Sequence, residues 1–273
     1  MKVKKILNIV LSGVLVLALA GCGAGQASED DNVVKVGIVG ENNDQWDVII
    51  DKLAEEGITV ELVTFTDYTQ PNQALADKEI DLNAYQTYAF LEEEAKDRGY
   101  DFTPIGETII APLTLYSNKI KSVDELKDGD SIGIASDPAN GGRALKILEA
   151  IGVIKVDESA GHTPAVGDIT ENPKNIEFVE VEAAQIPRLL DDVSAGFING
   201  NHAVDAGLYP SEDGIYVEEA KKESNKQYIN LIVARTEDKD NETYKKVAEI
   251  YQTDEVAEVI NEVFKGAYLP AWQ

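Results

Sequence analysis

The sequence predicts an α/β protein of two lobes joined by two extended crossings. From residue 33 onward, short β-branched runs alternate with segments of helical spacing, a pattern typical of parallel strands with right-handed crossovers. Two long extended runs, 102–118 and 228–235, interrupt this alternation. The chain has 273 residues, more than one typical domain needs, and 44% of them are hydrophobic, which is ample for two cores.

The first lobe is predicted to begin with a βαβαβ unit. Strands are expected at 33–39, 59–65 and 80–84, and helices at 46–53, 71–78 and 86–98. Gly57 and Gly99 follow two of these helices, where a C-cap belongs. Because βαβ units pair their strands in parallel, a parallel sheet is expected here.

The second lobe is predicted between the two extended runs, which are interpreted as the outgoing and the return crossing. Further strands are expected at 131–135, 175–181 and 195–199, and further helices at 183–191, 242–252 and 254–265. The last two helices would pack on the first lobe, so lobe I is predicted to comprise 33–113 and 231–273, and lobe II 114–230. In such a hinged protein the ligand is expected between the carboxyl ends of the strands.

The stretch 131–148 combines a buried strand, a turn and a helix start. Asn140 is the predicted N-cap, which puts Arg143 three residues into the helix. There the free backbone N–H groups and the helix dipole favour an anion, and the guanidinium can hold a carboxylate through two parallel bonds. A second interpretation places Arg143 on the solvent face, paired with one of the many acidic residues. Neither GxxxxGK[ST] nor GxGxxG occurs, so the stretch is no nucleotide loop.

The N-terminus has the pattern of a lipoprotein signal. Three lysines among the first five residues precede a mostly apolar run, 6–20, which is short for a bilayer span but suits a signal peptide. The run ends in Leu-Ala-Gly-Cys at 19–22, which resembles the lipobox of bacterial lipoproteins. Residues 1–21 are therefore predicted to be removed, Cys22 to be lipidated on the extracytoplasmic face of the cell membrane, and residues 22–32 to form a flexible linker.

Charge and residue inventory exclude several classes of function. Removal of residues 1–21 takes away three lysines, which leaves 21 basic and 50 acidic side chains and a net charge of −29. Such a surface repels nucleic acid and anionic headgroups, so only the lipid is expected to touch the membrane. The chain has two histidines, His162 and His202, and neither HExxH nor GxSxG. A binding protein without a metal or cofactor is therefore predicted, and a lipoprotein hydrolase is the weakest alternative.

Residues suited to binding cluster at predicted strand ends. Tyr68 follows the second strand, Tyr85 ends the third, and Asn199 ends the strand at 195–199, with Asn201 two residues later. Each also has an ordinary structural role, because tyrosines pack at rims and Asn-Gly pairs form turns. Several strand ends that carry aromatic or amide groups, together with Arg143, nevertheless favour a ligand site.

A family resemblance covers essentially all of the mature chain. Its motifs are, in order, the lipobox, FTDYTQPNQALADKEIDLNAYQ, IAPLTLYS, KSVDELKDG, SDPANGGRALKILEAIG, DITENPKNIEFVEVEAAQIPRLLDDV and INGNHA. Together they resemble the NlpA/MetQ family of substrate-binding lipoproteins of methionine ABC importers. The resemblance implies a type II periplasmic-binding-protein fold that closes on a free amino acid, with an ABC permease and its ATPase as partners.

The resemblance also implies roles for individual residues. Arg143 would hold the ligand carboxylate, Asn199 and Asn230 the polar end, and Tyr68 and Tyr85 would cover the thioether. With these, the predicted site includes Thr87, Asn140 and Asn201. A zwitterion needs such a set: a bidentate donor such as a guanidinium for its carboxylate, neutral acceptors for its ammonium and apolar walls for its side chain.

One short segment departs from the family pattern. Family members commonly read NFFQH where residues 83–87 read Asn-Ala-Tyr-Gln-Thr, so a pocket aromatic is Tyr85 and the usual histidine is Thr87. Methionine is the predicted ligand, and a smaller or more polar amino acid, a D-amino acid or a short peptide stay open. The alternative function is that of a surface interaction protein or adhesin with an altered or empty pocket.

Overall fold

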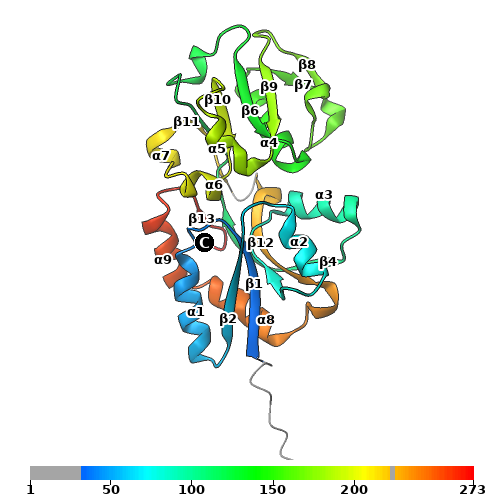
Figure 1. Cartoon of the computed structure of the whole chain (residues 1–273), viewed down its shortest axis with the longest axis vertical. Coiled ribbons are helices and arrows are strands. Elements are labelled where there is room, and N and C mark those ends of the chain that lie inside the picture. The colour runs from blue at the N-terminus through cyan, green and yellow to red at the C-terminus, as the bar shows by residue number, and fades with distance from the viewer. Residues whose placement is uncertain (1–31, 222–224) are drawn as a thin grey trace, which may run out of the picture. The chain divides into compact units, whose positions relative to one another are not determined.

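The structure is a computed structural model, and it describes residues 32–221 and 225–273 (Figure 1). The predicted signal peptide, Cys22 and all but the last residue of the predicted linker lie outside these described residues. Within the two described ranges, no helix is both long and apolar enough to cross a bilayer.

The first lobe is built on a six-stranded sheet in the order β13-β4-β12-β3-β1-β2. Its strands are β1 (Val33–Val39), β2 (Thr59–Phe65), β3 (Leu82–Asn83), β4 (Phe102–Ile110), β12 (Ile229–Arg235) and β13 (Leu269–Pro270). β1 pairs in parallel with β2 and β3, as the βαβαβ pattern predicts. The expectation of a purely parallel sheet is wrong, because β12 runs antiparallel to both β3 and β4.

The second lobe is built on a five-stranded sheet in the order β11-β5-β10-β6-β9. Its strands are β5 (Thr114–Tyr116), β6 (Ser131–Ala135), β9 (Glu177–Val181), β10 (Ala195–Ile198) and β11 (Gly214–Val217), and β7 (Lys155–Val156) pairs separately with β8 (Ile169–Glu171). β6 is parallel to β9 and β10, whereas β5 is antiparallel to β10 and β11. This sheet is therefore also mixed.

The chain passes between the sheets twice, as predicted, but the crossings are shorter than the extended runs. The run 102–118 divides into β4 of the first sheet and β5 of the second, so the outgoing crossing is residues 111–113. On the return, β12 already belongs to the first sheet. The chain therefore returns before β12, and not along residues 228–235 as predicted.

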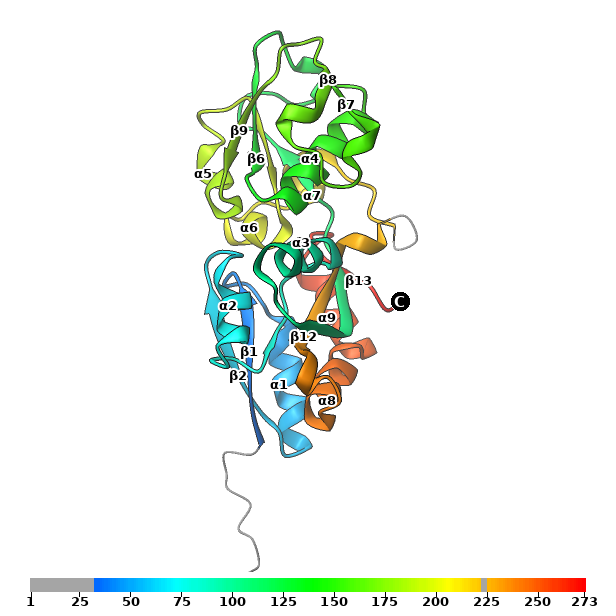
Figure 2. The same cartoon turned by 90° about the vertical axis from the view of Figure 1, so that its right-hand side faces the viewer.

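The helices flank the two sheets. They are α1 (Gln45–Glu55), α2 (Gln70–Ala76), α3 (Tyr88–Arg98), α4 (Pro138–Ala150), α5 (Ile186–Leu189), α6 (Gly200–Asp205), α7 (Pro210–Asp213), α8 (Glu242–Tyr251) and α9 (Asp254–Val263). The helix predicted at 183–191 is only the short α5, preceded by a 3₁₀ turn. α3 packs beside its own sheet and contacts α4 of the second lobe (Figure 2).

Each lobe has its own apolar core. In the first, Trp46 of α1 and Ile260 of α9 are buried with β1 side chains such as Val36, so the two C-terminal helices complete the core of the N-terminal sheet. In the second, Leu148 of α4 and Phe197 of β10 belong to a separate buried cluster. Because apolar burial holds each lobe together internally, the polar residues at the strand ends are left to face the space between the lobes.

Candidate ligand-binding site

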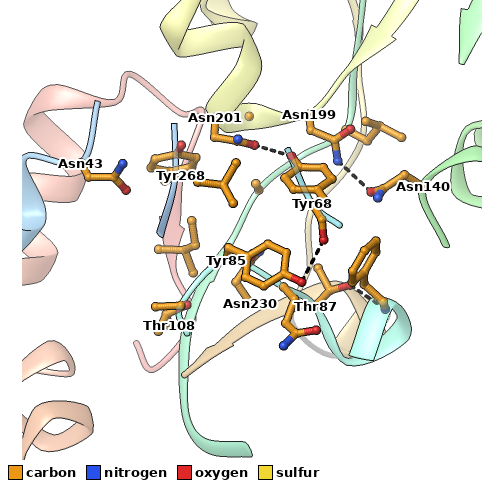
Figure 3. A pocket seen from close by; sticks show the side chains of 18 of the residues that line it. Asn43, Tyr68, Tyr85, Thr87, Thr108, Asn140, Asn199, Asn201, Asn230 and Tyr268 are labelled. Carbon is orange, nitrogen blue, oxygen red and sulfur yellow. Dashed lines mark hydrogen bonds between the residues drawn. The ribbon is translucent and has the colours of Figure 1, made fainter. Parts of the chain in front are cut away.

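A pocket lies where the carboxyl ends of strands from both sheets meet (Figure 3). Its empty volume is about 760 Å³ when the open space at its mouth is included. The structure brings all eight predicted site residues to its wall: Tyr68, Tyr85, Thr87, Asn140, Arg143, Asn199, Asn201 and Asn230. They come from both lobes, so closure of the lobes would surround a ligand.

The helix that carries Arg143 begins earlier than predicted. Asp137, not Asn140, is the N-cap of α4, and its Oδ1 accepts a hydrogen bond of 2.8 Å from the backbone N of Asn140. Pro138 explains the difference, because proline is favoured at the first helical position and pushes the residue before it into an extended conformation. Arg143 therefore lies in the second turn of α4, and the argument from its place in the first turn is wrong.

Arg143 is buried, with 4% of its surface exposed, so its predicted solvent-facing alternative is wrong. Its guanidinium nevertheless pairs with an acid: Nε donates to Oε1 of Glu218 over 3.2 Å and Nη2 donates to Oε2. Nη2 also donates to the carbonyl of Ala111 over 2.9 Å, and the ring of Tyr228 lies 4.0 Å from the guanidinium carbon. Among the described residues Nη1 has no partner, which leaves this group for a ligand.

The asparagines beside Arg143 offer a free acceptor. Asn199 donates from Nδ2 to Oδ1 of Asn140 over 2.7 Å (Figure 3). Nδ2 of Asn140 in turn donates to the carboxylate of Asp137. The Oδ1 of Asn199 is buried and has no hydrogen-bond partner within the part of the chain that the structure describes. Since buried polar atoms are nearly always bonded, this oxygen is suited to accept from a ligand ammonium.

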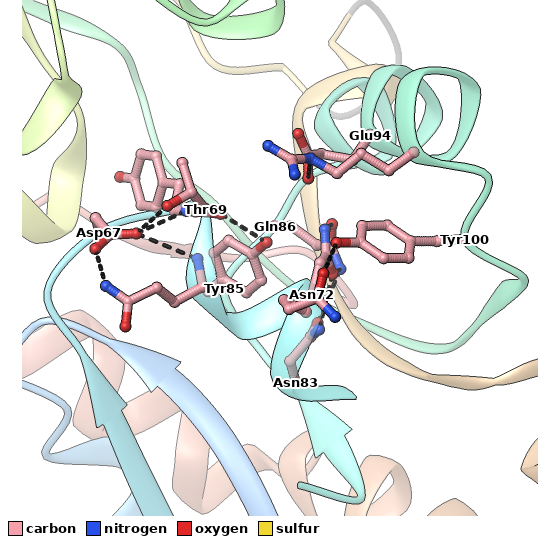
Figure 4. Close-up of polar contacts among 12 residues, drawn as sticks. Asp67, Thr69, Asn72, Asn83, Tyr85, Gln86, Glu94 and Tyr100 are labelled. Carbon is pink, nitrogen blue, oxygen red and sulfur yellow. Dashed lines mark hydrogen bonds and ion pairs between the residues drawn. The ribbon is translucent and has the colours of Figure 1, made fainter. Parts of the chain in front are cut away.

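Tyr68 links the two lobes. The carboxylate of Asp67 accepts from the backbone N of Thr69 over 2.8 Å and of Gln70 over 3.2 Å (Figure 4), and these bonds fix the turn that presents Tyr68. The hydroxyl of Tyr68 donates to Oδ1 of Asn201 in the second lobe. Burial raises the pKa of this phenol well above its ordinary value, so it stays a neutral donor.

Three aromatic rings form an apolar wall. Tyr68, Tyr85 and Phe90 lie with each pair of ring centroids 5.9 Å apart, and the hydroxyl of Tyr85 donates to the backbone oxygen of Tyr68 over 3.1 Å. Phe90 was not predicted, because one aromatic residue in a helix carries no signal that separates pocket from core. Such a wall suits a thioether, which packs well against aromatic rings.

Thr87 has a structural role that the sequence analysis missed. Its Oγ1 caps α3 by accepting from the backbone N of Phe90 over 3.2 Å, so the helix predicted from residue 86 begins at Tyr88. Thr87 also forms an isolated antiparallel bridge with Asn230. Two predicted site residues are thus held together by backbone pairing.

A buried amide network supports this side of the pocket (Figure 4). Nε2 of Gln86 donates to Oδ1 of Asn72 over 2.7 Å and to Oδ1 of Asn83 over 2.9 Å, and Nδ2 of Asn83 donates to Oδ1 of Asn72 over 3.0 Å. All three side chains are at most 2% exposed. Because Gln86 stands between Tyr85 and Thr87, the network fixes the backbone that carries both.

Other lining residues were missed: Asn43, Gln45, Thr108, Tyr251 and Tyr268. They belong to segments read as loop, strand and C-terminal helix, where nothing in the sequence distinguishes a pocket residue. Of the described residues that line the pocket, Arg143 alone carries a charge. Within the described ranges there is also no cluster of histidine, cysteine, aspartate and glutamate that could hold a metal.

Comparison with known proteins agrees with this geometry. The family described as NlpA lipoprotein matches residues 34–272. The D-methionine-binding lipoprotein MetQ of Salmonella typhimurium is 45% identical over 260 residues, which cover 94% of each chain. The crystal structure of the methionine-binding protein MetQ superposes with a TM-score of 0.84 at 43% identity, covering 89% of this chain and 99% of that one. A nutrient-binding protein from Burkholderia cenocepacia, solved bound to methionine, superposes with a TM-score of 0.83 at 40% identity, and the match covers 87% of this chain and 99% of that one. This chain belongs to the NlpA lipoprotein family.

Proposed function

We propose that the chain is the substrate-binding lipoprotein of an amino-acid ABC importer and binds methionine between its lobes. The lobes would follow the predicted bounds, residues 33–113 with 231–273 and residues 114–230, except that Ile229 and Asn230 belong to lobe I through β12. The observation that carries the proposal is the pocket itself, where a buried guanidinium and an unpaired amide oxygen lie near an aromatic wall. These are the groups that a zwitterion with an apolar side chain requires.

Each part of methionine has a partner among the lining residues. Nη1 of Arg143 would donate to the ligand carboxylate, and Oδ1 of Asn199 would accept from the ammonium. The thioether would pack against Tyr68, Tyr85 and Phe90. No lysine, aspartate or glutamate lines the pocket in the described ranges, so an ionised ligand side chain would be buried without an opposite charge.

The relatives support methionine as the ligand. The relative from Salmonella typhimurium is named for D-methionine, and the similar protein from Burkholderia cenocepacia was solved with methionine. The segment around Thr87 departs from the family pattern, so both enantiomers belong in the test. By the same family relation, an ABC permease with its ATPase would receive the ligand, and lipidated Cys22 would anchor the chain on the extracytoplasmic face.

Mass spectrometry of the molecule that purified protein releases on denaturation tests the proposal. Released methionine, or a rise in melting temperature with L- or D-methionine, is the expected result, because a ligand at roughly 100 times its dissociation constant stabilises the folded state by about 2.7 kcal/mol. An empty protein whose melting temperature responds to none of the twenty amino acids would contradict it. That outcome would favour the surface interaction protein.

A further inference from the structure

Glu218 holds Arg143 through a contact that neither the sequence analysis nor the family comparison assigns. The two side chains are 9% and 4% exposed, and the carboxylate meets the Nε and Nη2 edge of the guanidinium with both oxygens. Glu218 also accepts from the backbone N of Leu113 over 2.9 Å and from Nδ2 of Asn225 over 3.2 Å. A buried carboxylate that accepts from this many donors is held in one place.

The ion pair changes the net charge that a ligand meets. Of the described residues that line the pocket, Arg143 alone is charged. Glu218, which forms an ion pair with it, supplies the opposite charge. The two together are neutral. A zwitterion therefore enters without creating a net buried charge, whereas a carboxylic acid without an ammonium leaves one uncompensated negative charge and an amino amide one positive charge.

We propose that Glu218 makes the pocket selective for zwitterions over anions by neutralising Arg143 and by turning its Nη1 toward the ligand. This inference rests on the proposed function, because it assumes an amino acid beside Arg143. Glu218 is thus a positioning and specificity-determining residue. It acts on the ligand through Arg143 and through the charge of the site.

The position of Glu218 also ties the ion pair to the crossings between the lobes. Glu218 directly follows β11 and its backbone N donates to the carbonyl of Leu113, while its carboxylate accepts from the N of the same residue. Leu113 ends the outgoing crossing, and Ala111 of that crossing accepts from Arg143. The guanidinium is therefore fixed relative to the segment about which the lobes would move.

Three ligands of one shape test the proposal: methionine, its analogue without the ammonium, 4-(methylsulfanyl)butanoate, and methionine amide, which lacks the carboxylate charge. Dissociation constants are measured by titration calorimetry for the full chain, for Glu218→Gln and for Glu218→Asp. Glu219→Gln is the matched control, because it removes the same charge from the adjacent side chain, which is 75% exposed.

In Glu218→Gln the affinity for the anion relative to methionine should rise on the order of tenfold or more, since the unpaired guanidinium charge then attracts it. The amide should lose affinity relative to methionine. Glu218→Asp, which keeps the charge, and Glu219→Gln should both retain the wild-type order. A merely structural role would weaken all three ligands alike, and that result overturns the proposal.

If Glu218→Gln fails to fold, the affinities of the wild-type chain for the three ligands still test the proposal. The wild-type chain should bind methionine well above both charged analogues, and equal binding of the anion and methionine overturns the inference while leaving the proposed function intact. Wild-type protein that binds no methionine overturns the proposed function and the inference with it.

Discussion

The carboxylate of Asp205 accepts a hydrogen bond of 2.8 Å from Nδ2 of Asn42, and its Oδ1 also lies 3.2 Å from the backbone N of Asn42 and of Glu41. Asp205 ends α6 of the second lobe, whereas residues 41 and 42 follow β1 of the first. A carboxylate from one lobe is thus held by N–H groups of the other. Together with the bond from Tyr68 to Asn201, this contact joins the lobes beside the pocket.

Asp205→Asn should therefore weaken ligand binding without altering the pocket. Loss of about 1 kcal/mol from these solvent-exposed, charge-assisted bonds corresponds to roughly fivefold in affinity. The loss should lie mainly in a faster dissociation rate, because the closed form opens more readily. Stopped-flow fluorescence measures both rates, with exposed Asp192→Asn as the control. An unchanged dissociation rate would show that the contact does not hold the lobes closed.

Arg143→Lys should weaken every amino-acid ligand by a similar factor. A lysine ammonium cannot meet the two oxygens of Glu218 and still present a donor at the position of Nη1. The expected loss is on the order of tenfold for each 1.4 kcal/mol removed. Calorimetric titration with a panel of neutral amino acids measures it, and a reordered panel would place the ligand side chain, not its carboxylate, at Arg143.

Thr87→His introduces the residue that the family resemblance leads us to expect here, and it should change the ranking of ligands in favour of methionine. It also removes the side-chain cap of α3, which costs about 1 kcal/mol of stability. Thr87→Ser keeps the cap and Thr87→Ala removes it without adding a ring, so the two controls separate stability from selectivity. Melting temperatures and a ligand panel on all three variants give the answer. If the histidine variant leaves the ranking unchanged, residue 87 does not face the ligand side chain.

His202 predicts a pH dependence of stability. Its ring lies 4.9 Å from that of Tyr68, its Nε2 is buried with no partner in the described ranges, and burial lowers its pKa from 6.5 to about 4 although Asp205 and Asp67 oppose the shift. Between these two pKa values the unfolded chain binds more protons than the folded one. The contribution is therefore fully present above pH 6.5 and is lost as the pH falls toward 4, by about 3 kcal/mol in total.

Urea unfolding of wild type and His202→Phe at several pH values isolates the contribution of His202 to stability, because phenylalanine keeps the ring contact and does not titrate. The stability difference between the two proteins should grow from pH 7 to pH 4 in favour of the variant. His162→Phe, at an exposed position, should show no such trend. Parallel pH profiles for wild type and His202→Phe would mean that His202 titrates normally in the folded state.

The parallel strands of both lobes were predicted well, because the residues within each strand are enough to indicate it. The strands 33–39 and 59–65 were placed at their observed bounds, because seven-residue runs rich in β-branched residues favour a strand before any partner strand is known. The antiparallel course of β12 was not predicted, because which sheet a strand joins depends on distant partners. The N-cap of α4 was wrong by three residues, although Pro138 was available as a signal.

Within the site, residues next to strand ends were predictable and residues that act through them were not. Tyr85 and Asn199 stand where parallel strands end, which topology places beside a ligand. Glu218 meets Arg143 across 75 positions of sequence, and on a chain with 50 acidic residues no pattern distinguishes it. The amide network of Asn72, Asn83 and Gln86 is likewise visible only once β3 and α2 are packed.

The position of selenomethionine bound in a crystal would show which end of the pocket holds the ligand side chain. Residues 23–273 contain no sulfur, because the single cysteine and the single methionine are Cys22 and Met1, so a selenium peak can come only from the ligand. One anomalous peak is expected against the rings of Tyr68, Tyr85 and Phe90, with the ligand carboxylate at Nη1 of Arg143. Crystals grown with saturating selenomethionine that show no selenium in the pocket, or selenium beside Arg143 with the carboxylate at the aromatic wall, would contradict the account.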